Sequence, residues 1–471
     1  MYPRRDLTAT LATLPPEWAH DVRPEIRAAV QTSPRRLCVL DDDPTGTQTM
    51  HGITVYMDWT VDTLVEALSA DAVTFYLLTN SRSLPPAPAE ALNRAIGANL
   101  REASARTGVP FSVISRSDST LRGHFPGELR ALEAGLAQTF DAWLIVPFFL
   151  EGGRYTLDDV HYVAEGAELV PADLTPFAQD AAFGYHTAYL PGWVEEKTGG
   201  RIPAQQVARI SLTDIRVGGP NAVAAKLLTL RAGAVGVVNA ASYGDLEVFV
   251  AGLLRAEAAG GRYLYRTAAS FVATRSAIFE RPLVRGAALA AAEQTGGLII
   301  VGSYVPKTGR QLAALAASGI ECALEVDVKA LLDPAQREQV IANVSAAAES
   351  ALREGRDTVI YTSRLLVGAE DADRSLKIGQ QVSDGLIAIV RGISTRPRFV
   401  LAKGGITSSD IATKAYGMRQ AQVLGQLLPG VPVWQMGAES RFPGLTYVVF
   451  PGNVGDDDAL VISRRILRRE D

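Results

Sequence analysis

The feature of this sequence that most limits its fold is the alternation of short apolar runs with longer stretches of helical character. The runs at 36–41, 73–78 and 143–146 are short and mainly apolar. A helical pattern at 87–107 has prolines at its start, where the first turn of a helix tolerates them. Apolar strands separated by helices are typical of a mainly parallel sheet covered on both faces. The sequence therefore predicts an α/β protein with Rossmann-like sheets.

The length points to more than one domain. At about 150 residues per domain, a chain of 471 residues is expected to form two or three. We expect an N-terminal arm at 1–35, a first domain at 36–280 and a second at 285–471. Within the first, the alternation stops at 148–201, which predicts an irregular insert with a functional or oligomer-contact role. The stretch 262–279 is expected to lead out of this domain.

The second domain shows the same alternation of elements. The pattern predicts strands at 298–301, 325–328, 398–402 and 446–450, and an alanine-rich helix at 285–294. We therefore expect a second, mainly parallel sheet in this part of the chain.

Charge and cysteine content exclude several classes of protein. Lys and Arg number 46 and Asp and Glu 51, a net charge of −5 that argues against nonspecific nucleic-acid binding. The only cysteines, Cys38 and Cys322, exclude a disulfide framework and a four-cysteine zinc site, and they fit a reducing compartment. The N-terminal residues lack the apolar region of a signal peptide, and no apolar run reaches the ~18 residues of a membrane span. We expect a cytoplasmic protein with no membrane partner.

Three consecutive carboxylates follow the first predicted strand, at Asp41, Asp42 and Asp43. Such a group repels itself unless a metal ion, an arginine or a hydroxyl-rich ligand offsets the charge. Ligands of open α/β sheets bind at the carboxyl ends of the strands. A binding site is the stronger interpretation, and a solvated turn with aspartate caps is the alternative.

Polar residues also follow the next strands of the first domain. The sequence TNSRS at 79–83 contains Arg82, and RSDSTLRGH at 116–124 contains Arg116, Asp118 and Arg122. An arginine fork pairs with a carboxylate, and Asp and Asn bind sugar hydroxyls. Three strand ends of this kind predict a site for a small polyhydroxylated acid, although each residue taken alone could be a cap.

Small residues follow the strands of the second domain. VGSY contains Ser303, LAKGGIT contains Lys403 and Gly404, and FPGN contains Gly452. Glycines let the backbone approach a phosphate closely, and free N–H groups bind it. One such turn is as easily a plain turn, but three in one domain predict a nucleotide phosphate site.

Two familiar nucleotide motifs are absent from the sequence. It contains no G-x-x-x-x-G-K-[ST] loop, and no G-x-G-x-x-G follows the first strand. Three acids after that strand would repel a pyrophosphate, which argues against a Rossmann dehydrogenase. The histidines show no paired metal-ligand spacing, so no metal site is expected from the protein's own motifs.

Several segments together resemble a known family. LDDDPTGTQT, TNSRSL, SRSDSTLRGHFPGEL, VGSYVPKTGRQ, LAKGGITSSDIATK and FPGNVGD occur in this order. They are similar to the four-carbon acid sugar kinases from about residue 36 to the C-terminus. The resemblance implies a substrate domain, a nucleotide domain and an active site in the cleft between them. It also implies phosphorylation of the terminal hydroxyl of erythronate, threonate or an oxo-tetronate, with ATP and ATP-borne Mg²⁺ as cofactors, and together with the long insert it suggests a homodimer.

The resemblance also assigns site residues. Asp118 is favoured over the aspartates after the first strand as the group that orients or deprotonates the hydroxyl. Substrate binding is expected at Asp42, Asp43, Arg82, Arg116, Ser119, Thr120 and Arg122. ATP binding is expected at Ser303, Lys403, Gly404, Gly405, Ile406, Thr407, Gly452 and Asn453.

Two departures from the family pattern and two alternative functions remain open. Arg116 stands where many members have lysine, and the insert at 148–201 is like that of a longer subgroup, so the acid that is bound stays open. The alternatives are an NAD-dependent hydroxyacid dehydrogenase and a sugar-acid-binding protein without catalysis.

Overall fold

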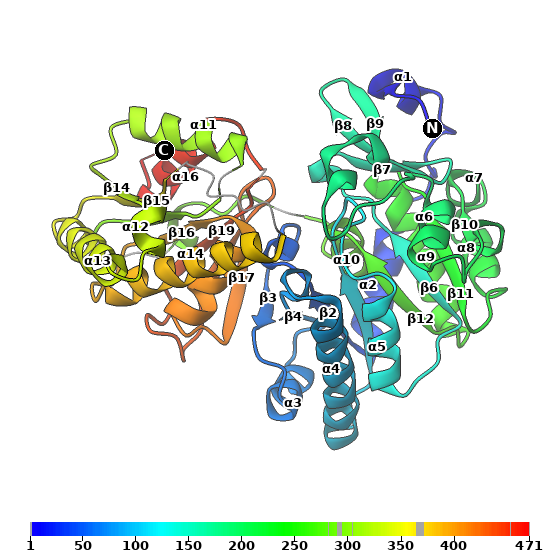
Figure 1. Cartoon of the computed structure of the whole chain (residues 1–471). Coiled ribbons are helices and arrows are strands. Elements are labelled where there is room, and N and C mark those ends of the chain that lie inside the picture. The colour runs from blue at the N-terminus through cyan, green and yellow to red at the C-terminus, as the bar shows by residue number, and fades with distance from the viewer. Residues whose placement is uncertain are drawn as a thin grey trace. The chain divides into compact units, whose positions relative to one another are not determined.

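The chain divides into two compact units in the computed structural model (Figure 1). The first contains Met1–Gly46 and Asp58–Glu280, and the second contains Thr47–Met57 and Arg281–Asp471. Residues 47–57 lie within the range expected for the first domain but belong to the second unit, and the N-terminal arm belongs to the first. The structure describes residues 2–280, 282–289, 294–303, 305–363, 372–452 and 454–470.

Parallel strands build the main sheet of the first unit. Their order is β10-β11-β6-β12-β5-β2-β4, and every neighbouring pair is parallel. The predicted α/β class is confirmed. The strands are β2 (Arg36–Asp41), β4 (Thr74–Leu78), β5 (Phe111–Arg116), β6 (Ala142–Val146), β10 (Ala208–Ile210), β11 (Ala234–Val238) and β12 (Tyr263–Thr267).

The strand order reverses beside β2. From β2 the chain adds β4 on one side and then β5 on the other, so β2 and β5 flank a topological switch point. In the register of these strands, Asp41 lies opposite both Leu78 and Arg116. Ligands of open α/β sheets bind outside the carboxyl ends of strands at such a point. The polar segments after β2, β4 and β5 are therefore gathered where this fold places ligands.

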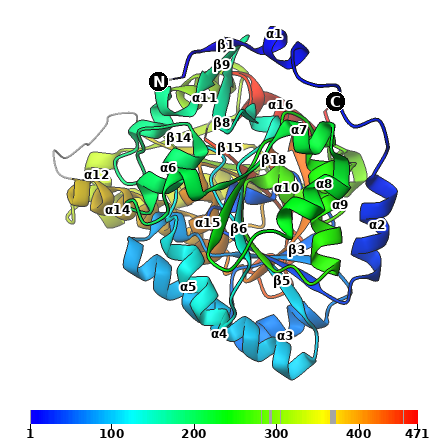
Figure 2. The same cartoon turned by 90° about the vertical axis from the view of Figure 1, so that its right-hand side faces the viewer.

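Helices cover both faces of the sheet. Crossovers in parallel sheets are right-handed. The helices before and after β5 lead from β4 to β5 and from β5 to β6, towards one edge of the sheet. The helices after β10 and β11 lead back towards the other edge, so the two groups cover opposite faces. The first group contains α3 (Val61–Ser69), α4 (Pro86–Thr107) and α5 (Gly127–Leu136), which lie side by side in Figure 2. The second contains α2 (Arg23–Thr32), α7 (Leu212–Arg216), α8 (Gly219–Leu227), α9 (Tyr243–Ala258) and α10 (Ala269–Arg275).

The insert at 148–201 is more regular than expected. It contains β7 (Arg154–Leu157), β8 (Val160–Glu165), β9 (Glu168–Pro171) and α6 (Leu190–Lys197). These strands form an antiparallel sheet that β1 (Arg5–Asp6) of the arm completes, next to α1 (Leu7–Ala12). The β7–β8 turn places Asp158 and Asp159 in the left-handed region, at φ 51° and 63°. Acidic residues at those positions give a weaker hairpin signal than Asn-Gly or Asp-Gly.

The stretch 262–279 does not simply lead out of the first unit, and that expectation is wrong. It supplies β12, a fully buried strand between β5 and β6, and then α10. The sequence hides this strand because Arg266 interrupts its apolar run (YLYRT).

The second unit has a mixed sheet. Its order is β3-β17-β18-β19-β16-β13-β15-β14, with the pairs from β19 to β14 parallel and those from β3 to β19 antiparallel. The β17–β18 hairpin was not predicted. The strands are β3 (Ile53–Tyr56), β13 (Leu298–Val301), β14 (Cys322–Val326), β15 (Thr358–Thr362), β16 (Val400–Lys403), β17 (Gln420–Leu428), β18 (Val431–Met436) and β19 (Thr446–Phe450).

Two predicted elements of the second unit fall elsewhere. The strand expected at 325–328 is β14 and ends at Val326, because the Asp327 side chain caps the next helix at the N–H groups of Lys329 and Ala330. The helix expected at 285–294 appears only as a 3₁₀ turn at Gly286–Ala288, and residues 290–293 lie outside the described part.

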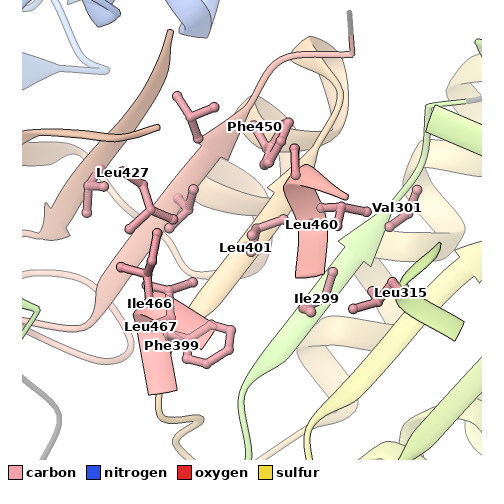
Figure 3. Close-up of a cluster of buried hydrophobic side chains, with 14 of the residues drawn as sticks. Ile299, Val301, Leu315, Phe399, Leu401, Leu427, Phe450, Leu460, Ile466 and Leu467 are labelled. Carbon is pink, nitrogen blue, oxygen red and sulfur yellow. The ribbon is translucent and has the colours of Figure 1, made fainter. Parts of the chain in front are cut away.

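Two helices of the second unit, α11 (Pro306–Ala317) and α16 (Ala459–Arg468), pack against an apolar core. Figure 3 shows Ile299, Leu401 and Phe450 from three parallel strands meeting Leu460 and Ile466 of the last helix. Among the described residues of the whole chain, no helix is both long and apolar enough to cross a membrane. The helices are α11 (Pro306–Ala317), α12 (Val328–Leu332), α13 (Arg337–Arg353), α14 (Ala372–Gly392), α15 (Gly405–Asp410) and α16 (Ala459–Arg468).

Candidate functional site

A pair of predicted site residues forms the centre of the charged cluster in the first unit. Arg82, in the turn after β4, donates from Nη2 to Oδ1 of Asp42 (2.5 Å) and from Nε to Oδ2 (3.2 Å). The Ser117 hydroxyl, after β5, donates to the same Oδ2 at 2.7 Å. The three strand ends therefore meet at one buried carboxylate, as the motifs predict.

Asp118 is held by the loop that contains it. Arg122 donates to it from Nε (2.9 Å) and Nη2 (3.2 Å), and the Thr120 hydroxyl is a further donor. Arg82 Nη1 lies 3.7 Å from Asp118 Oδ1. Burial alone would raise the pKa of Asp118, but the two guanidinium groups outweigh it and hold the pKa far below its ordinary value. Asp118 is therefore an ionised acceptor and a weak base.

Asp41 and Arg116 form a second, buried ion pair next to that of Asp42 and Arg82. Arg116 Nη1 donates to Asp41 Oδ1 at 3.0 Å, and both side chains are almost fully buried. Burial raises the pKa of Asp41 to about 7, even though Arg116 lowers it. A Cβ on Gly46 would lie 2.0 Å from Asp41 Oδ2, so only glycine fits there. Arg116, expected to bind substrate, is thus engaged inside the protein.

Asp43 completes the aspartate triplet. It accepts from the backbone N–H (2.9 Å) and the hydroxyl (2.5 Å) of Thr45, and Arg82 Nη1 lies 3.5 Å away. Burial would raise the pKa of Asp43, yet Arg82 and Arg116 lower it overall. The self-repulsion of the triplet is therefore offset by arginines of the same unit.

The insert supports the loop of Asp118 through backbone carbonyls. His161 Nε2 lies 2.7 Å from the Ser119 carbonyl oxygen, and the Tyr185 hydroxyl donates to the Thr120 carbonyl at 2.9 Å. Burial lowers the pKa of His161 to about 4, so its ring is neutral at pH 7. These contacts hold the backbone of Ser119 and Thr120, the two residues of this loop that were expected to bind the substrate.

Other residues near this loop were missed by the sequence analysis. Arg266 of β12 donates to the Arg122 carbonyl at 2.7 Å, and its guanidinium lies 5.1 Å from the Trp193 ring centre. Arg154 of β7 and Asp180 of the insert approach Arg122 as well. A charge inside an apolar strand could have marked Arg266, whereas no local motif marks the residues of the insert.

In the second unit, three predicted turns meet at Ser303. A Cβ on Gly452 would lie 3.2 Å from Ser303 Oγ, and one on Gly404 would lie 3.2 Å from Ser303 Cβ. A Cβ on Gly302 would lie only 2.2 Å from Thr407 Oγ1. Gly404 has φ 116°, which disfavours any other residue. The turns after β13, β16 and β19 thus come together, as expected of a phosphate site.

Lys403 lies at the end of β16 and is fully buried. Its Nζ donates to the carbonyl of Pro451 (3.0 Å) and lies 4.0 Å from the Phe450 ring centre. Burial, with help from the nearby Lys307, lowers its pKa to about 7. Lys403 therefore anchors the turn that contains Gly452.

The remaining predicted ATP ligands differ in their settings. Gly405 is the first residue of α15, and Ile406 is 57% exposed. Asn453 lies outside the described residues. Within the described ranges of both units, no group of three or more His, Cys, Asp or Glu side chains is arranged to hold a metal ion.

Comparisons with known proteins assign the two parts of the chain to domain families. Residues 37–275 match a family of sugar-binding N-terminal domains, and residues 298–460 match a family of nucleotide-binding C-terminal domains. The class is thus a two-domain protein with a sugar-binding and a nucleotide-binding part. The chain belongs to the four-carbon acid sugar kinase family.

Individual relatives extend the comparison. A D-erythronate kinase of Heliobacterium modesticaldum is 28% identical over 332 residues, which cover 67% of this chain and 69% of that one. A Salmonella typhimurium LT2 structure described as a candidate tRNA synthase has a TM-score of 0.66 at 14% identity, with 91% of this chain and 99% of that chain covered. A Haemophilus influenzae protein of the DUF1537 family has a TM-score of 0.59 at 16% identity, with 91% and 100% covered. The two structures share the fold.

Proposed function

We propose that this protein is an ATP-dependent kinase that phosphorylates the terminal hydroxyl of a four-carbon sugar acid such as erythronate, threonate or an oxo-tetronate. The observation that carries the proposal is the meeting of Asp42, Arg82 and Asp118 at the switch point of the sugar-binding unit. The D-erythronate kinase among the relatives supports this substrate class.

The first unit supplies groups suited to a polyhydroxylated ligand. Asp43 and Asp118 are carboxylates of low pKa that accept hydrogen bonds from hydroxyls. The hydroxyls of Ser119 and Thr120 extend the same loop. These groups can orient a small sugar acid without any change in their own protonation.

The second unit fits a nucleotide. A Cβ on Gly404 or Gly452 would crowd Ser303, and one on Gly302 would clash with Thr407. Glycine at these positions suits close approach to phosphates. Ser303 and Thr407 offer hydroxyl donors at that place. Bound ATP with Mg²⁺ would supply the phosphoryl group that is transferred.

Asp118 is proposed to orient the acceptor hydroxyl rather than to act as a strong general base. Its pKa, lowered by Arg122 and Arg82, makes it a poor base but keeps it ionised and ready to accept. Phosphoryl transfer depends mainly on positioning and charge stabilisation, with little demand for a strong base.

The test is ADP release from Mg-ATP with the erythronates, threonates and their oxo forms, one acid per reaction. Release with one acid would support the proposal and define the stereochemistry. If ATP stabilises the protein against heat but no acid is turned over, the acceptor is another sugar acid. If NADH stabilises the protein and ATP does not, the dehydrogenase alternative replaces the kinase. If an acid binds with no turnover of any nucleotide, the protein is a sugar-acid-binding protein.

A further inference from the structure

The guanidinium of Arg154 lies next to the loop of Asp118 and has no carboxylate partner in the described part of the first unit. Arg154 opens β7 of the insert, and its Nε is buried without a hydrogen-bond partner. Among the residues that the structure describes, no carboxylate forms an ion pair with it. A buried guanidinium nitrogen without a hydrogen-bond partner is costly, and a bound anion is one way to offset that cost.

The other arginines near this loop already have partners, and Arg266 donates to the Arg122 carbonyl at 2.7 Å. Arg82 binds both oxygens of Asp42, and Arg116 binds Asp41. Arg122 binds Asp118. A substrate carboxylate that bound to one of these three would compete with a carboxylate of the protein.

Arg154 also lies close to the loop that contains Asp118. Its guanidinium carbon is 5.4 Å from the ring centre of Phe177, and that of Arg122 is 5.1 Å from the same ring. Burial lowers the pKa of Arg154, Asp118 raises it and Arg122 lowers it. Two cations on one ring repel each other, and an anion bound beside them would relieve that repulsion.

We propose that Arg154 is the residue that binds the carboxylate of the substrate, so that the insert selects an acid over the neutral polyol of the same length. This inference rests on the proposed function for the nature of the ligand. A guanidinium fork binds a carboxylate through two parallel hydrogen bonds, which a point charge cannot reproduce. The hydroxyls of the same ligand are then left to Asp43 and Asp118.

The test compares the affinities of D-erythronate and erythritol by calorimetry on the full chain. R154Q is expected to weaken D-erythronate binding tenfold to hundredfold, because a charged hydrogen bond is lost, and to leave erythritol and ATP binding unchanged. R101Q, at an exposed position of α4, is the matched control and should equal wild type. R154K keeps the charge and the aliphatic stem, so it tests the guanidinium fork alone and serves if R154Q folds poorly. We expect R154K to bind D-erythronate several-fold more weakly than wild type.

Two results would overturn the inference. One is D-erythronate affinity within twofold of wild type in both R154Q and R154K. The other is a wild-type protein that binds D-erythronate and L-threonate no more tightly than their polyols. The proposed function fails separately: if acid binding depends on Arg154 but no ADP is released with any acid, the carboxylate site stands and the kinase does not.

Discussion

Arg82 donates two hydrogen bonds to Asp42, at 2.5 and 3.2 Å. The sequence analysis expects each of these two residues to bind the substrate. In the structure the two side chains bind each other. Arg82 also lies within 4 Å of Asp43 and Asp118. One guanidinium therefore links three carboxylates of the site, which favours fixed positions for the groups proposed to bind the ligand.

Asp118→Asn should lower kcat at least about a hundredfold, which is the rate loss expected when a positioning or proton-accepting group is removed. The ATP affinity should stay near wild type. The amide keeps the shape but cannot accept from Arg122 and a hydroxyl in the same way. Steady-state kinetics with a four-carbon acid would measure this. Asp62→Asn removes an exposed aspartate that pairs with Arg106 and should be silent. Near-normal turnover of Asp118→Asn would refute the assigned role.

His161 should make the first unit sensitive to acid. Its pKa is lowered to about 4 from 6.5, so between these pH values the unfolded chain binds a proton that the folded chain excludes. The free energy of unfolding should therefore fall by about 3 kcal/mol as pH drops through this window. Urea unfolding at several pH values would show a smaller fall for His161→Gln, which keeps a donor for the Ser119 carbonyl. His186→Gln, at an exposed position, should keep the wild-type slope, and equal slopes for all three proteins would contradict the prediction.

Gly404→Ala should weaken nucleotide binding about tenfold or more. The backbone at φ 116° disfavours a side chain, and the added Cβ would lie 3.2 Å from Ser303 Cβ. Gly309→Ala is the matched control, since a Cβ on this helical glycine of α11 meets nothing within 4 Å. It should stabilise the protein by about 0.5–1 kcal/mol and leave the ATP dissociation constant unchanged. Equal ATP affinity in the two variants would show that the turn at Gly404 is not part of the nucleotide site.

Lys403 should take up a proton when ATP binds. Its pKa of about 7 lies below the ordinary 10.5 because the side chain is buried. Nearby phosphate charge raises the pKa of a lysine, so at pH 8 binding should draw close to one proton per site. Calorimetry in buffers of different ionisation enthalpy would measure the uptake, and Lys403→Met should abolish it. Equal uptake by the two proteins would place the phosphates away from Lys403.

The position of the first site could be predicted from sequence because parallel strands end at a common edge. Asp42, Arg82 and Asp118 each follow a strand of this sheet, so their meeting needs only the order β4-β2-β5. The pairing of Arg116 with Asp41 could not be predicted, since it depends on the register of two strands far apart in sequence.

The missed elements owe their positions to long-range contacts. β12 enters between β5 and β6 although it comes last among the strands of its sheet, and no periodicity reports such an insertion. The insert places His161 and Tyr185 against the loop of Asp118 from more than forty residues away. Such contacts carry no local sequence signal, which is why Arg154 was also overlooked.

The most direct test of the kinase is transfer of label from γ-³²P-ATP to a four-carbon acid, with wild type and Asp118→Asn side by side. The account predicts label in the acid, on its terminal oxygen, for wild type, and a rate at least about a hundredfold lower for the variant. Label that remains in ATP, or appears only as inorganic phosphate with every acid, would contradict it.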